Sequence, residues 1–120
     1  MTTNISLSKY EKQVLPKFRD KLNQSESEED VKKFFVETIE RFLGLATDDA
    51  IKFQYDDIRL MPDQPPYYHL SQQLLDCEAM KALQNSDLTS VLKRIAEPAV
   101  HRYMHLAKHP EKTNSKIKGH

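Results

Sequence analysis

Apolar side chains recur every three or four residues along most of the chain, which is typical of amphipathic helices. The clearest stripe lies in residues 31–43, after Ser25, Ser27 and a run of acidic residues. Either serine is suited to cap this helix, and Gly44 follows the stripe where helices often end. We expect the helix to anchor the core, because three phenylalanines can bury a large apolar area. The stripe consists of Val31, Phe34, Phe35, Ile39 and Phe42.

A first and a last helix are predicted on either side, and each contains a proline. The first begins at Ser8, which has capping-box spacing with Glu11. The last covers residues 88–109, where apolar side chains again share one face. Pro16 and Pro98 lack a backbone N–H and clash with the preceding turn, so they predict a kink or a break in their helices.

The pattern changes in the middle of the chain. Residues 48–61 alternate apolar and polar side chains with one change of phase, which favours a small β-hairpin turning at Asp56-Asp57 over a single helix. Three prolines in residues 62–66 predict a loop. A third helix is predicted to follow and to end near Gln84. Its apolar residues cover a wide arc, which is typical of a central helix or of one in an interface.

The sequence therefore predicts a mainly α-helical fold in a single compact domain of about four helices. The first and fourth are expected to be kinked or split at Pro16 and Pro98, and a small hairpin is expected between the second and third. We expect this domain to span residues 1–110 and residues 111–120 to form a disordered basic tail. With only two glycines in the chain, glycine-rich phosphate loops and dinucleotide fingerprints are excluded.

Composition narrows the functional classes further. The 18 basic and 18 acidic residues cancel, so the chain as a whole has no charge that would attract a polyanion. No apolar run reaches the ~20 residues of a membrane span, and the first residues lack the pattern of a secretory signal. The lone Cys77 cannot form an intrachain disulfide. We expect a soluble, cytoplasmic protein with no cofactor and no membrane contact.

The charges are nevertheless segregated along the chain. Residues 26–57 hold ten acidic and four basic residues, a net charge of −6. Residues 93–120 hold two acidic and seven basic residues, a net charge of +5. Two interpretations stay open: ion pairing between the acidic second helix and its basic neighbours, or docking of a bipolar surface on a charged partner or a second copy.

The last helix carries the candidate binding residues. His101, His105 and His109 lie four residues apart on one helical face, and two such histidines can chelate a transition metal. The nearby cations would repel a metal ion, and they suggest an alternative anion site for phosphate or nucleic acid, extended by the basic tail. Those cations are Arg94, Arg102 and Lys108.

Two short motifs have plainer explanations. The segment Pro65-Pro66-Tyr67-Tyr68 matches the polyproline ligand of WW domains, but a loop whose tyrosines pack on the core explains it better. The aspartate pairs at residues 48–49 and 56–57 fit caps and turns better than a calcium loop. Cys77 is expected to be a structural thiol.

No set of residues with the context of a catalytic site is recognisable. We therefore expect a non-enzymatic interaction or regulatory protein that binds a protein partner, and the wide apolar arc of the third helix indicates self-association. The alternatives are the phosphate- or nucleic-acid-binding protein and the metal-binding protein described above.

Overall fold

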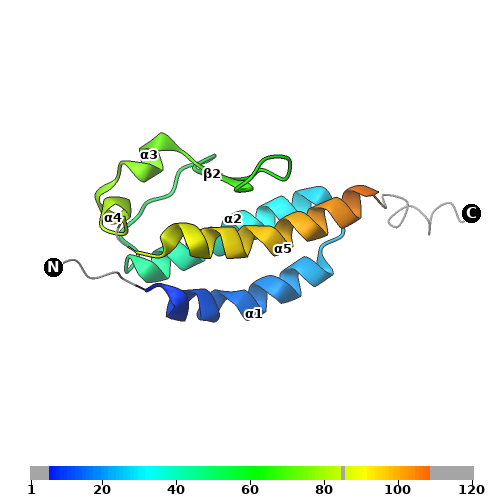
Figure 1. Cartoon of the computed structure of the whole chain (residues 1–120), viewed down its shortest axis with the longest axis horizontal. Coiled ribbons are helices and arrows are strands. Elements are labelled where there is room, and N and C mark those ends of the chain that lie inside the picture. Colours follow the sequence, from blue (N-terminus) through cyan, green and yellow to red (C-terminus); the bar gives the residue numbers. More distant parts are fainter. Residues whose placement is uncertain (1–5, 85, 109–120) are drawn as a thin grey trace, which may run out of the picture.

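A computed structural model describes residues 6–84 and 86–108 of the chain. Three long helices lie alongside one another: α1 (Ser8–Gln24), α2 (Glu28–Ala46) and α5 (Leu88–Lys108). Helices α1 and α5 run in the same direction and α2 runs against them (Figure 1). The chain between α2 and α5 lies across these two helices on the side away from α1 (Figure 1).

We call residues 47–87 the arm and the three long helices the bundle. The arm contains β1 (Ile58–Leu60), β2 (Tyr68–Leu70), α3 (Gln72–Leu75) and α4 (Glu78–Lys81). The two strands form an antiparallel hairpin in which Arg59 faces His69. Strand β1 lies mainly against α2, and both strands also contact α5.

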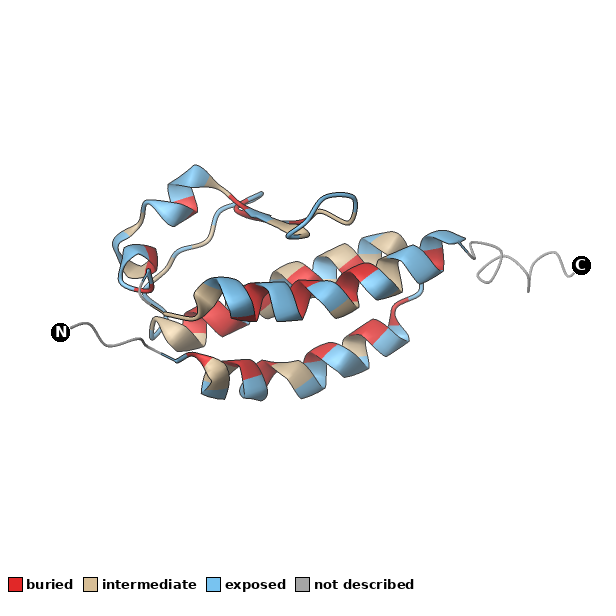
Figure 2. Cartoon of the chain, viewed as in Figure 1, coloured by how far each residue is buried: buried red, intermediate tan, exposed pale blue. Residues whose placement is uncertain are grey.

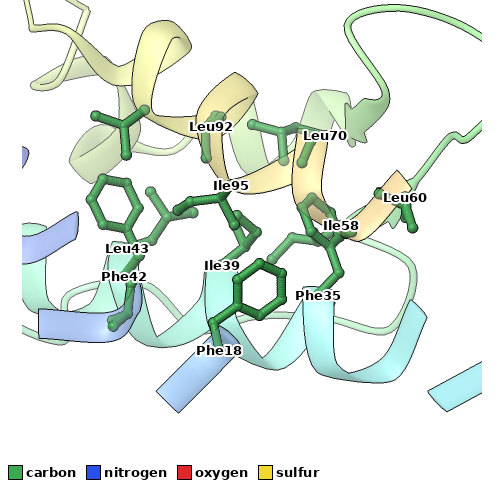
Figure 3. Close-up of a cluster of buried hydrophobic side chains, with 14 of the residues drawn as sticks. Phe18, Phe35, Ile39, Phe42, Leu43, Ile58, Leu60, Leu70, Leu92 and Ile95 are labelled. Carbon is green, nitrogen blue, oxygen red and sulfur yellow. The ribbon is translucent and has the colours of Figure 1, made fainter. Parts of the chain in front are cut away.

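The predicted stripe of α2 lies at the centre of the core, except for Phe34, which is only half-buried and lies outside the core cluster. Phe35, Ile39 and Phe42 have no exposed surface. Side chains from all other layers surround them, including Phe18 of α1 and Ile95 of α5 (Figure 3). The hairpin contributes Ile58, Leu60 and Leu70 to the same cluster. The buried face of each long helix therefore points inward, with exposed residues on the outer faces (Figure 2).

The predicted fold class is confirmed: the chain is mainly helical, forms one globule and has a small hairpin between helices. Neither proline splits its helix, because Pro16 lies inside the continuous α1 and Pro98 inside the continuous α5. Buried side chains flank each proline, such as Val14 and Phe18 around Pro16. Packing on both sides thus holds each helix together despite the missing hydrogen bond.

The capping box predicted at the start of α1 is wrong. Ser8 is already helical, and Leu7 takes the cap position without a side-chain hydrogen bond. The backbone N–H of Leu7 instead donates to the carboxylate of Asp87, 2.8 Å away, just before α5. Glu11 is buried and turns toward α5. The start of α1 is therefore held by tertiary contacts rather than by a local cap.

At α2 one predicted boundary is confirmed and the other is wrong. The hydroxyl of Ser27 caps the helix by accepting from the N–H of Asp30 at 3.1 Å. The helix does not end at Gly44 but continues to Ala46. Gly44 instead allows a close approach, because a Cβ there would lie 3.0 Å from the carboxylate of Asp49.

The single third helix was also a wrong prediction. The segment forms two short helices, α3 and α4, separated by Asp76 and Cys77. Cys77 has an extended backbone with ψ of 153°, which interrupts the helical hydrogen bonds. Leu74 and Met80 are buried. The apolar residues of this segment therefore belong to two short helices rather than to the circumference of one.

The hairpin is present and the predicted strand with Ile58 and Leu60 exists as β1, but the predicted partner strand and turn are wrong. Residues 51–55 form no strand, and the turn at Asp56-Asp57 does not join two strands. Asp57 is 4% exposed, and its carboxylate accepts from the N–H of Gln54 and the hydroxyl of Ser71, both at 2.6 Å. These bonds join the start of β1 to the end of β2. The partner of β1 is therefore β2, the strand that follows the proline loop.

Candidate interaction surface

Within the described residues, the hairpin has two backbone edges that no third strand pairs with. Two ladder bonds flank the paired residues: the N–H of Ser71 donates to the C=O of Asp57 at 2.9 Å, and that of Met61 donates to the C=O of Tyr67 at 2.7 Å. Facing pairs in an antiparallel ladder alternate between hydrogen-bonded and non-bonded. Every second residue between these two bonds therefore directs its backbone groups away from the neighbouring strand.

On β1 the outward-directed residues are Ile58 and Leu60, and on β2 they are Tyr68 and Leu70. Their outward N–H and C=O groups bond to no other part of the described chain. An unpaired strand edge is a template for another extended chain. The described residues thus offer two possible docking edges, one on each side of the hairpin.

A groove of about 680 Å³ runs beside the edge of β1, between this strand and the flank of α2. Its walls carry three basic and three acidic residues: Lys32, Lys33, Arg59, Glu29, Glu37 and Asp56. Val36 of α2 supplies an apolar part of the lining. Tyr55 stands at the rim with 94% of its surface exposed. The β1 groove is therefore amphipathic and charged.

The groove at the edge of β2 has a different chemistry. It measures about 520 Å³ and lies between β2, α3 and the start of α5. Its lining contains no aspartate, glutamate, lysine or arginine and includes four leucines. Leu75 of α3 is 40% exposed within it. Burial raises the pKa of the Tyr68 hydroxyl, which agrees with these apolar surroundings.

Two of the residues predicted to bind anions already form hydrogen bonds with other residues of the chain. Arg94 forms a bidentate pair with Glu11, with nitrogen–oxygen distances of 2.7 and 2.9 Å, and these hydrogen bonds raise the pKa of Arg94. Arg102 donates to the hydroxyl of Ser25 at 3.2 Å and to its carbonyl at 2.8 Å, which fastens the α1–α2 turn to α5. Lys108 is exposed.

These structural roles of the arginines were missed at the sequence level. A signal for one of them exists, because Glu11 falls on the apolar stripe of α1 between Leu7 and Val14. A carboxylate on a buried face needs a charged or hydrogen-bonding partner. The sequence contains no comparable signal for the contact between Arg102 and Ser25, which are far apart in the chain.

The predicted metal ligands are only partly within the described residues. His101 and His105 are exposed on α5 and border a shallow groove with Arg19 and Arg102, whereas His109 lies outside the described residues. Within the described ranges, no group of three or more His, Cys, Asp or Glu side chains is arranged to hold a metal ion. The metal site stays a prediction without structural support.

The proline–tyrosine motif forms a closed loop. The N–H of Tyr67 donates to the C=O of Gln64 at 2.8 Å, and Tyr67 has a φ of +77°. Polyproline helices require φ near −75°, so this segment does not present the conformation that WW domains bind. Tyr68 is half-buried in β2. The loop and its tyrosines are thus part of the hairpin.

Comparison with known proteins gives no relative: no family model, no curated protein and no solved structure matches the chain. In the part of the chain that the structure describes, no helix is both long enough and apolar enough to cross a membrane. Function is therefore inferred from the surfaces of the molecule alone.

Proposed function

We propose that this chain is a non-enzymatic interaction protein that binds an extended segment of a partner protein at the edge of β1. The outward backbone groups of Ile58 and Leu60, at the side of the 680 Å³ groove, carry this proposal. A segment laid along the edge would add a third strand to the hairpin. Main-chain hydrogen bonds supply affinity in this binding mode, and pockets for alternate side chains supply specificity.

The lining of the groove suits an extended segment. Alternate side chains of an added strand would point toward α2, where Val36 offers apolar contact and Lys33 offers charge. The remaining side chains would lie on the outer face beside Arg59. Tyr55 at the rim is available to cover the bound segment, and exposed tyrosines are frequent anchors at interfaces.

Arg59 indicates the chemistry of the partner. It lies between the two outward-directed residues, so a residue of the added strand would face it directly. Its present ion pair with Asp56 is 3.7 Å long and both side chains are half exposed, so that pair is weak and easily replaced. Opposite charges facing each other across strands are stabilising. We expect an acidic side chain at the facing position, flanked by apolar residues.

The two alternative functions have less support. Anion binding by the end of α5 would compete with the carboxylate that holds Arg94 and the carbonyl that holds Arg102. Removing either arginine from its partner would weaken the fold. Metal binding would depend on His101 and His105 with no third ligand near them in the described residues.

A displayed library of random eight-residue peptides, selected against the full chain, tests the proposal. Enriched peptides should alternate apolar residues with a central Asp or Glu. On binding, the amides of Ile58 and Leu60, which have no partner among the described residues, should become protected from hydrogen exchange. Arg59→Glu should weaken these peptides at least about tenfold and should favour a central Lys or Arg instead.

Arg19→Glu on α1 is the matched control, since it is an exposed charge reversal remote from the hairpin. It should leave binding unchanged. Enriched peptides that protect other amides, or that bind equally to the Arg59→Glu variant, would disprove the proposal. A selection without enrichment would disprove it as well.

A further inference from the structure

The edge of β2 is an independent surface with its own chemistry. Tyr68 and Leu70 direct their backbone groups away from β1, and both residues line a leucine-rich groove without aspartate, glutamate, lysine or arginine. We infer that a second copy of this chain pairs with this edge. The two β2 strands would run antiparallel about a two-fold axis, and the two hairpins would join into one four-stranded sheet.

The distribution of charge distinguishes the two edges. In a two-fold pair of β2 strands, His69 faces its own counterpart, and the lining contributes no acidic residue, lysine or arginine. The same operation at β1 would set Arg59 against the Arg59 of the second copy. Like charges directly opposite each other destabilise a strand pair. A second copy is therefore compatible with the β2 edge and disfavoured at the β1 edge.

An exposed leucine supports the same assignment. Leu75 is 40% exposed in this groove, and large apolar side chains with such exposure are few among the described residues. A lining without aspartate, glutamate, lysine or arginine meets its own two-fold copy without repulsion between such charges. Burying Leu75 of both copies removes apolar surface from water, which favours association.

A two-fold contact at β2 closes the assembly at two copies, because it uses the same edge of both chains. Only two residues direct backbone groups outward, because Pro66 lies before the strand and Ser71 caps α3 directly after it. Once two β2 strands have paired, the β1 strands form the outer edges of the sheet. An extended segment can still bind there, so a negative result for the dimer would leave the proposed function untouched, and the reverse holds as well.

The oligomeric state of the full chain tests this inference. Light scattering after size exclusion should give twice the chain mass of 14.0 kDa. Measurements should extend to a chain concentration of about 1 mM, where half of the chains are paired even if the dissociation constant of the dimer is about 1 mM. The amide of Leu70 should gain protection from hydrogen exchange as the concentration rises. A monomer throughout this range, or a dimer in which Leu70 stays unprotected, would overturn the inference.

A matched pair of variants locates the contact. Leu75→Glu should raise the dissociation constant of the dimer about tenfold or more. Met104→Glu is the control, because Met104 is 37% exposed but lies on α5 away from the groove. Circular dichroism should show that both variants remain folded. Equal effects of the two substitutions, or no effect of Leu75→Glu, would contradict pairing at β2.

Discussion

The bundle and the arm are built in different ways. The bundle consists of helices of 17, 19 and 21 residues, joined by fully buried apolar side chains and by the Glu11–Arg94 pair. The arm consists of strands of three residues and helices of four, joined by the hydrogen bonds of Asp57. Elements this short are marginal alone and depend on the surface beneath them.

We therefore expect the bundle and the arm to have different roles, one in stability and the other in binding. The bundle supplies most of the stability, and the arm presents strand edges that a stable fold does not require. Regions with short elements and few buried contacts open more readily than the core, and surfaces for binding are often found there. Three substitutions test this division, and they follow in order of the size of their expected effect.

Phe35→Ala should have the largest effect and should destabilise the whole molecule. Phe35 has no exposed surface and lies between the bundle and the hairpin (Figure 3). Truncation of a buried phenylalanine costs about 3–5 kcal/mol, so the free energy of unfolding in urea should fall by that amount. Phe34→Ala is the control: Phe34 is only half-buried on the same helix and should cost clearly less. Similar losses in both variants would contradict the central position of Phe35 in the core.

Asp57→Ala should act mainly on the arm. It removes the acceptor for the N–H of Gln54 and the hydroxyl of Ser71, which should make local opening easier by about 1–3 kcal/mol. Native-state hydrogen exchange should show faster exchange of the Met61 and Ser71 amides, with little change in α2. Asp63→Ala, in the exposed loop, should leave exchange unchanged. If α2 loses the same protection, the arm and the bundle unfold as one unit.

Glu40→Gln should have the smallest effect, and its sign depends on pH. Burial raises the pKa of Glu40, and the charges of Glu37 and Asp57 raise it further. The folded chain therefore holds the Glu40 proton more tightly than the unfolded chain, so ionisation of Glu40 lowers stability as pH rises above the ordinary value of 4.5. The glutamine variant should be more stable than the wild type at pH 7.

This gain should disappear at about pH 3, where Glu40 is protonated in both states. Urea unfolding at the two pH values measures it. Glu97→Gln, at an exposed position on α5, is the control and should change the free energy of unfolding little. A gain that persists at low pH would contradict the raised pKa of Glu40, whose largest cause is burial.

The predictions from sequence succeeded where the pattern was long. The stripe from Val31 to Phe42 spans several turns, and periodicity over several turns is unambiguous. They failed in the arm, where Cys77 interrupts a helical pattern and Asp57 occupies a buried position. The candidate site was missed for the same reason: it depends on which strand pairs with β1. Local alternation cannot show that Leu60 pairs with Tyr68 rather than with a nearer residue.

Amphipathic periodicity was sufficient to establish the helical class, the three long helices and the dominant role of the α2 phenylalanines. It was sufficient because each helix is shaped by neighbours within four residues in the chain. The positions of Arg94, Arg102 and Asp57, and the two open edges of the hairpin, follow from contacts between distant segments. Such contacts form only when the helices pack. A polar group that packing buries needs a hydrogen-bond partner, and the fold decides which distant residue is close enough to serve as one.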